Sequence, residues 1–274
     1  MATPDISIRL EVLPGESVAE QVANAAKYGF DAIALPGRFK DWWLRPLREC
    51  RGDLPLPMAS ISLGFVHSLL SPSEARRREC RDSLLELLDL CAELGATRLN
   101  VPPCLIQDNP ERITESGSFG TLRERLDAML LEELPAIGNA AAEREVVFLI
   151  EPVNKYESEY LNSVVHAAEL VDELDQSAVK VTADFFHMQL EELDTAAALK
   201  RSGAVVQHVH VAENTRVEPG PGSMDYRPGF RELQRVGYAG LLEVECRYLS
   251  GPADAVLPAS ANYLRSVWNQ SAMQ

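Results

Sequence analysis

Short apolar segments alternate along the chain with longer segments in which apolar residues recur every three or four positions. The segment 146–150 is wholly apolar, as in a strand that is buried on both faces. Between Ser73 and Leu94, apolar residues such as Leu84 and Cys91 recur at the spacing of one helix face. The chain therefore reads as a succession of strands and helices rather than as one class of element.

This pattern predicts eight strands, each followed by a helix. The strands are expected at 6–10, 31–35, 57–62, 98–101, 146–150, 179–182, 204–209 and 241–244. The helices are expected at 18–28, 41–51, 73–94, 121–144, 163–174, 193–201, 230–236 and 253–267. Within the helix at 121–144, Pro135 and Gly138 are candidate points of interruption, and residues 102–120 are expected to form a loop.

The regular alternation predicts one α/β domain, a single (β/α)8 TIM barrel over residues 1–274. The mean repeat is about 34 residues, which is the size of one strand-helix unit. A doubly wound open sheet is the second interpretation. It is disfavoured because the first strand is followed by Glu11-Val-Leu-Pro-Gly-Glu-Ser17 and not by a glycine-rich dinucleotide-binding turn.

Composition and charge narrow the classes of partner. The chain has 26 Lys and Arg against 41 Asp and Glu, a net charge of −15, which argues against nucleic acid and against anionic membranes. No apolar run approaches the roughly 20 residues of a membrane span, and the first residues lack the features of a signal peptide. The five cysteines form no CxxC pair. We expect a reduced, cytoplasmic protein.

Polar residues follow four successive predicted strands, where a barrel places its catalytic groups. Glu151, Asp184, His210 and Glu245 stand about one strand-helix unit apart. Three carboxylates and one imidazole suit a divalent cation such as Mn²⁺, Mg²⁺ or Co²⁺. Any one of them alone reads equally well as a helix cap or a solvated loop residue, but four in consecutive units favour a metal site.

Two further histidine positions leave alternatives open. His67 follows the third predicted strand and is a candidate for the barrel mouth and for substrate binding. His208 and His210 share one face of a strand, which also suits a simple buried, hydrogen-bonded pair.

The second half of the chain resembles the xylose isomerase-like TIM-barrel sugar isomerases and epimerases, the AP endonuclease family 2 fold. The resemblance rests on LIEPVNKYESEYLN (149–162), TADFFHMQLEE (182–192), HVHVAENTRVEPGPG (208–222) and GYAGLLEVE (237–245). Within the superfamily, these segments are most similar to the tagatose, psicose and ribulose 3-epimerase-like ketose 3-epimerases. The first half agrees only in general layout.

The resemblance implies roles for individual residues. It implies that Glu151, Asp184, His210 and Glu245 hold a divalent metal, most often Mn²⁺, and that Glu151 and Glu245 also transfer protons. It implies further roles, with His187 and Arg216 holding substrate oxygens and Glu157 lying near the end of the substrate. Phe185 departs from the family, which usually has a small polar residue there, and Ala34-Leu35-Pro36 replaces an acidic position. A dimer or tetramer is also implied.

The resulting hypothesis is an isomerase: a metal-dependent epimerase or isomerase of a ketose or keto-polyol, acting through a metal-stabilised enediolate. The same site also suits a dehydratase of the inosose or dehydroshikimate type, or a lyase of 3-keto-C-glycosides. A non-catalytic sugar-binding barrel is a weaker alternative. A metal-dependent abasic-site nuclease is disfavoured by the acidic charge and by the presence of only five histidines.

Overall fold

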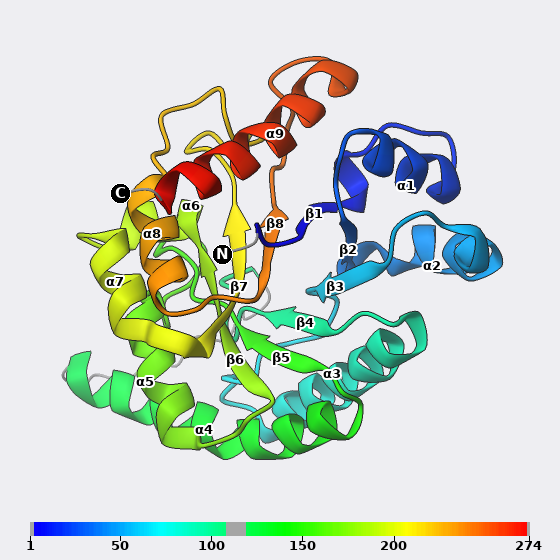
Figure 1. Cartoon of the computed structure of the whole chain (residues 1–274). Helices are drawn as coiled ribbons and strands as arrows, with labels where there is room; N and C mark the ends of the chain where they lie inside the picture. Colours follow the sequence, from blue (N-terminus) through cyan, green and yellow to red (C-terminus); the bar gives the residue numbers. More distant parts are fainter. Residues whose placement is uncertain (1–2, 108–118, 273–274) are drawn as a thin grey trace.

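The predicted strands form a closed parallel barrel in which β1 to β8 follow one another in chain order and β8 pairs with β1. The computed structural model describes residues 3–107 and 119–272, and the side chains of 119–121 lie outside this description. Helices surround the barrel on its outside (Figure 1). The predicted (β/α)8 fold is thereby confirmed.

The strands are short, and their bounds agree with the apolar runs to within about two residues at most ends. They are β1 (Ile6–Arg9), β2 (Ala32–Pro36), β3 (Met58–Ser62), β4 (Arg98–Val101), β5 (Val147–Ile150), β6 (Val179–Asp184), β7 (Val206–Val211) and β8 (Leu241–Val244). The helices are α1 (Val18–Lys27), α2 (Lys40–Cys50), α3 (Glu74–Leu94), α4 (Phe119–Glu143), α5 (Val164–Leu174), α6 (Phe185–Glu191), α7 (Thr195–Ser202), α8 (Arg227–Arg235) and α9 (Ala253–Ser271).

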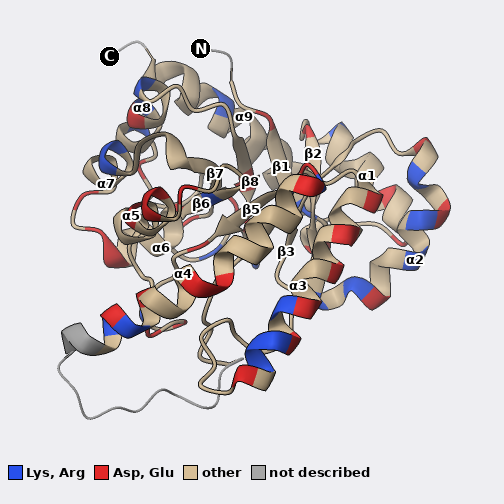
Figure 2. Ribbon diagram, turned by 90° about the horizontal axis from the view of Figure 1, so that it is seen from below, with Lys and Arg blue, Asp and Glu red and all other residues tan. Residues whose placement is uncertain are grey.

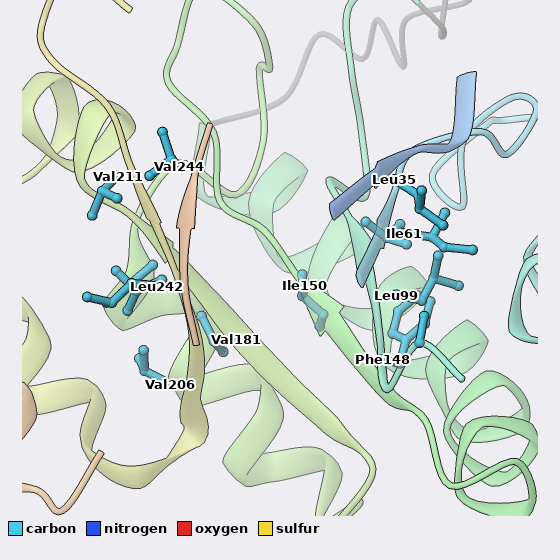
Figure 3. Packing of buried hydrophobic residues seen from close by; sticks show 14 of the residues in the cluster. Leu35, Ile61, Leu99, Phe148, Ile150, Val181, Val206, Val211, Leu242 and Val244 are labelled. Carbon is cyan, nitrogen blue, oxygen red and sulfur yellow. The ribbon is translucent and has the colours of Figure 1, made fainter. Parts of the chain in front are cut away.

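One face of each strand is apolar and packs beneath the surrounding helices. Leu99 of β4, Val181 of β6 and Leu242 of β8 are completely buried and belong to one continuous core between barrel and helices (Figure 3). Burial of an aliphatic side chain contributes about 1.5–3 kcal/mol. This layer therefore stabilises the barrel and leaves the opposite strand faces for other side chains.

The interior of the barrel is largely polar, with a few apolar side chains such as Leu149. Ser60 of β3 donates to Glu243 of β8 at 2.6 Å, and Thr182 of β6 donates to Asn100 of β4 at 2.6 Å. Neither pair joins neighbouring strands, so both hydrogen bonds cross the barrel. The strands thus alternate between an apolar outer face and a polar inner face, with the period of two that a strand requires.

Helix ends follow the predicted local signals. The Ser17, Ser73 and Ser163 hydroxyls accept backbone N–H groups at the starts of α1, α3 and α5. Gly95 ends α3 with φ of 72°, a left-handed conformation that glycine adopts without steric cost. These caps set the ends of helices that flank the strands.

The structure rules out the candidate interruption of α4 and adds one helix. Helix α4 continues through Pro135, where a proline costs one helical hydrogen bond, and through Gly138. A Cβ on Gly138 would lie 2.9 Å from Val179 Cγ2, so glycine allows α4 to approach β6 closely. The short helix α6 was not predicted. Residues 108–118 of the predicted loop lie outside the described residues.

The outer helices carry interspersed acidic and basic residues (Figure 2). Basic residues gather in the N-terminal half of α3, where the sequence reads Arg76-Arg-Arg78 and continues to Arg81. Within the described ranges, none of the helices combines the length and apolarity that a bilayer crossing demands.

Candidate metal and substrate site

Four buried side chains converge where β5, β6, β7 and β8 end. Glu151, Asp184, His210 and Glu245 each offer one potential ligand atom, and all four atoms lie within 4.8 Å of one another. Glu151 and Glu245 directly follow the last residues of β5 and β8, Asp184 ends β6, and His210 lies one residue before the end of β7. The four residues predicted from sequence spacing therefore do come together.

Glu151 is held on both of its carboxylate oxygens. Asn100 Nδ2 donates to Oε2 at 2.7 Å, and His210 Nδ1 lies 2.9 Å from Oε1. Asn100 in turn accepts the Thr182 hydroxyl. Because all these groups are buried, the chain Thr182–Asn100–Glu151 fixes the direction of the carboxylate.

Asp184 combines a structural and a site role. Its Oδ1 accepts the backbone N–H of Phe186 at 2.7 Å and so caps α6. Its Oδ2 lies 3.2 Å from Arg216 Nη1 and 3.3 Å from His187 Nε2. Burial raises the pKa of Asp184 despite these two neighbours.

The hydrogen-bond partners of His187 determine which of its two ring nitrogens carries the proton. The backbone N–H of Asn154 donates to His187 Nδ1 at 3.2 Å, and Asn154 Nδ2 lies 2.7 Å from the same nitrogen. Because both neighbours are donors, Nδ1 is the acceptor and Nε2 carries the proton. That N–H points to the Asp184 side of the site, where it can donate to a substrate oxygen.

Arg216 brings a buried cation to the ligand cluster. Its guanidinium donates to Asp184 and, at 2.9 Å, to Glu245 Oε2, and it lies 4.3 Å from the centre of the Phe186 ring. Its φ of 60° places it in the left-handed region, at a tight turn in the loop between β7 and α8. The loop thus directs a cation onto two of the predicted metal ligands.

Glu245 lies between two arginines, one of which the sequence analysis missed. Arg9, at the end of β1, donates to Glu245 Oε1 at 2.6 Å and also pairs with Glu11. Burial alone would raise the pKa of Glu245, but the charges of His210, Arg216 and Arg9 together lower it far below its usual range. Glu245 is therefore ionised at neutral pH.

His210 responds to the same charges in the opposite direction. Burial lowers its pKa, but the carboxylates of Glu245, Glu151 and Glu243 outweigh burial and raise the pKa to about 10. These three carboxylates, two of which belong to the ligand set, thus attract positive charge to one point of the barrel. This donor set of oxygens with one imidazole nitrogen fits a divalent cation of the Mn²⁺ type.

A cavity of about 440 Å³ opens above these residues and is within the size range of small-molecule sites. Glu157, His187 and Arg216, all three expected to contact substrate, line it. Glu157 accepts Asn154 Nδ2 at 3.0 Å and lies 3.5 Å from Arg247 Nη2.

His67 lies elsewhere and does not contribute to the described lining of this cavity. Its Nε2 lies 2.8 Å from Glu79 of α3. Among the described residues, no contact of His67 supports its predicted substrate-binding role, which stays a prediction.

The residues missed by sequence reasoning share one signal. Arg9, Asn100 and Glu243 occupy the inner face of strands of only four residues. In ISIR and RLNV, polar residues alternate with apolar ones, a period of two that indicates a polar barrel interior, and in LLEV the glutamate stands between two apolar residues. Runs this short are too brief for that period to stand out along the chain.

Comparison with known proteins gives one family over most of the chain. The family model described as xylose isomerase-like TIM barrel matches residues 22–267. The 3-dehydro-D-guloside 4-epimerase of Escherichia coli K12 is 26% identical over 234 residues, which are 85% of this chain and 88% of that protein. The L-ribulose 3-epimerase of Mesorhizobium japonicum is 26% identical over 259 residues, 90% of this chain and 81% of that protein.

A solved structure shows the same fold. The apo form of 3-keto-D-glucoside 4-epimerase from E. coli superposes with a TM-score of 0.82 at 24% identity, covering 96% of this chain and 99% of that one. The similar proteins are named as epimerases and isomerases, which supports an enzyme of the isomerase class.

Proposed function

The chain belongs to the xylose isomerase-like TIM barrel family, and from this premise we propose that it is a divalent-metal-dependent sugar epimerase. The observation that carries the proposal is the convergence of Glu151, Asp184, His210 and Glu245 within 4.8 Å at the floor of a small-molecule cavity. Mn²⁺ is the proposed metal, with Co²⁺ or Mg²⁺ as substitutes that the same ligands can hold.

A bound divalent cation supplies Lewis-acid stabilisation of the negative charge that develops on substrate oxygens. Glu151 and Glu245 supply the acid-base pair. One carboxylate removes the proton from the carbon beside the carbonyl, and the other returns a proton to the opposite face. Such proton transfer is typically worth about 10²–10⁴-fold in rate.

The surroundings of the two glutamates suit this division of work. Asn100 fixes Glu151, while Arg9 and Arg216 hold Glu245 ionised. His187 presents an N–H and Arg216 a guanidinium to the same space, and both can hydrogen-bond substrate oxygens as charge develops. Glu157 stands farther out, beside Arg247, where the far end of a sugar would lie.

The size of the cavity guides the choice of substrates to be tested. A second hollow of about 290 Å³ shares Leu105, Gln107, Glu157 and Arg247 with the first and adds Tyr156. The two hollows together therefore extend beyond the residues that border the ligand cluster. A test panel should therefore contain both free ketoses, including D-tagatose, D-psicose and L-ribulose, and 3-keto-glycosides.

We further propose a cytoplasmic location and a homo-oligomeric assembly for the chain. Five free cysteines support a reducing, cytoplasmic environment. Large exposed apolar side chains, such as Trp42 and Leu193, support a homodimer or homotetramer. Sedimentation velocity at several protein concentrations measures the assembly directly.

The first experiment combines elemental analysis with solvent isotope exchange. Purified protein supplied with Mn²⁺ is expected to retain one ion per chain and to catalyse deuterium entry from D₂O at the carbon beside the carbonyl. Entry at C3 of a ketose identifies a 3-epimerase, and entry at C4 of a 3-keto-glycoside identifies a 4-epimerase. NMR of the products reads the position.

Two variants make the test specific. Glu151→Gln is expected to lose exchange by at least about 10²-fold, because the carboxylate can no longer accept the proton. Glu86→Gln removes an exposed carboxylate on α3, away from the cavity, and is expected to match the wild type. Metal retention without exchange on any panel member would refute an epimerase of these sugars, and absence of metal under replete conditions would refute the metal-dependent proposal.

A further inference from the structure

We propose that Glu243 is a positioning residue: it orients the His210 ring so that Nδ1 is presented to the metal ligands. The inference rests on the proposed metal-dependent function. Glu243 lies on β8, two residues before Glu245, and pairs in register with His210 of β7. It is completely buried inside the barrel, one layer below the ligand cluster.

One oxygen of Glu243 is fixed by two neighbours. Oε2 accepts the Ser60 hydroxyl at 2.6 Å and lies 3.1 Å from His208 Nε2. Ser60 belongs to β3 and His208 to β7, so contacts from both sides of the barrel hold the carboxylate. This carboxylate therefore has little freedom to rotate.

The other oxygen faces His210. Glu243 Oε1 has no hydrogen-bond partner among the described residues, nor does His210 Nε2, and the two atoms lie 3.6 Å apart. Leaving a buried polar atom unsatisfied costs about 1–3 kcal/mol. A small rotation of the ring brings these two atoms into a hydrogen bond that satisfies both.

This hydrogen bond also determines the state of Nδ1, on the opposite edge of the His210 ring. His210 Nδ1 lies 2.9 Å from Glu151 Oε1 and 3.6 Å from Glu245 Oε2. If Nε2–H donates to Glu243, a neutral imidazole must present its lone pair at Nδ1. Glu243 thus selects the tautomer that can ligate a cation, as carboxylates behind ligating histidines do in general.

A metal ion bound by Glu243 itself is an alternative that can be tested. His208, His210 and Glu243 themselves offer ligand atoms within 4.8 Å of one another. Against this alternative, Ser60 and His208 already contact Glu243 Oε2 at hydrogen-bonding distance. Our assignment therefore predicts one ion per chain, with Glu243 outside its coordination sphere.

The experiment is a Co²⁺ titration followed by d–d absorption, with bound metal counted by elemental analysis. Wild type is expected to bind one ion. Glu243→Gln is expected to weaken Co²⁺ affinity by about 10–100-fold without changing the number of sites. The matched control is Glu133→Gln, which neutralises another buried carboxylate, held by Arg77 and Arg81 outside the cavity, and is expected to retain wild-type affinity.

A second measurement does not depend on the folding of a variant. In ¹⁵N spectra of the Zn²⁺-loaded wild type, His210 is expected to show a protonated Nε2 and a metal-bound Nδ1. The reverse assignment would overturn the inference, as would unchanged affinity in Glu243→Gln. Two ions per wild-type chain, one of them lost in Glu243→Gln, would make Glu243 a ligand and also overturn it. A wild type that binds no Co²⁺ or Zn²⁺ would instead refute the proposed function on which the inference rests.

Discussion

At the scale of the residue, the same side chain often serves two purposes. Asp184 caps α6 through Oδ1 and faces Arg216 through Oδ2, so its local role as a cap and its place in the ligand cluster are compatible. Asn100 likewise links Thr182 to Glu151 without being a ligand itself. Substitutions inside the barrel are therefore expected to affect stability and metal binding together.

Asn100→Ala is expected to lower the free energy of unfolding. The change leaves Glu151 Oε2 without its 2.7 Å donor and the buried Thr182 hydroxyl without its acceptor. Each unsatisfied buried group costs about 1–3 kcal/mol. Urea unfolding measures the loss. Asn139→Ala, on the exposed face of α4, serves as the control and is expected to lose no stability.

Thiol accessibility offers an independent check of the core. Burial raises the pKa of the thiols of Cys80, Cys91 and Cys246 to about 12 in each case. Cys50 and Cys104 are partly exposed. A thiol-disulfide reagent at pH 8 is therefore expected to modify at most two thiols in the native protein and five after denaturation. Rapid native modification of three or more thiols would contradict this packing.

At the scale of the element, loops after the strands decide what the site can contact. The loop between β7 and α8 depends on Glu213, whose carboxylate accepts the N–H of Gly220 at 2.8 Å and of Met224 at 3.1 Å. The backbone N–H of Glu213 donates to the Val217 carbonyl at 3.0 Å. This internal bonding fixes the turn that directs Arg216 into the cavity.

Gly222→Ala is expected to disturb this loop. A Cβ at position 222 would lie 2.2 Å from Glu213 Oε2, so the carboxylate would have to give up its backbone donors. Overpacking of this kind costs about 1–3 kcal/mol. We expect reduced thermal stability and a raised KM, because Arg216 is no longer held.

The control for this prediction is another glycine. At Gly52 a Cβ meets none of the described residues within 4 Å, so Gly52→Ala is expected to leave stability and KM unchanged. Equal effects of the two substitutions would show that the loop does not depend on the contact between Gly222 and Glu213.

At the scale of the whole molecule, four consecutive strand-helix units each contribute one ligand candidate, and a bound cation would link them. Because a ligand that binds only the folded state stabilises it, free cation at about 100 times its Kd adds about 2.7 kcal/mol. For a chain of this size that corresponds to a rise in Tm on the order of 5–10 °C.

Differential scanning calorimetry with Mn²⁺ and with EDTA measures this shift. Asp184→Asn is expected to abolish most of the difference, because it removes one of the three carboxylate charges of the ligand set. An equal shift in Asp184→Asn would place the stabilising ion elsewhere.

The rise in Tm caused by the metal is expected to depend on pH in a definite direction. The neighbouring carboxylates, acting against burial, raise the pKa of His210 from its usual 6.5 to about 10. The charged His210 therefore stabilises the metal-free fold fully below pH 6.5, and this contribution is lost as the pH rises through about 10. Ligation requires the neutral ring, so metal binding at pH 7.5 is expected to release about one proton.

The measurement follows from these opposite trends. The Tm of the metal-free protein is expected to fall between pH 6.5 and 9.5, while the increase in Tm caused by a fixed Mn²⁺ concentration is expected to grow. Calorimetric titration in buffers of different ionisation enthalpy counts the released proton. Release of no proton would contradict the charged state of His210.

The sequence alone determined the architecture and the four converging residues. Alternation of strand and helix patterns is a local property, and the strands carry polar residues at their carboxyl ends, which a barrel gathers at one mouth. Short-range signals such as Ser17 and Gly95 fixed helix ends for the same reason. Two features of the helices escaped prediction. Helix α4 is continuous because of contacts with residues distant in the sequence. Helix α6 begins at Asp184, a cap that is also a site residue.

Only the tertiary structure decided how the inner faces of the strands meet. Arg9 is separated from Glu245 by 236 positions, and Ser60 from Glu243 by 183, so nothing local links either pair. Closure of the barrel brings them within hydrogen-bonding distance and excludes water. That proximity sets the ionisation of Glu245 and His210, which their residue types could not indicate.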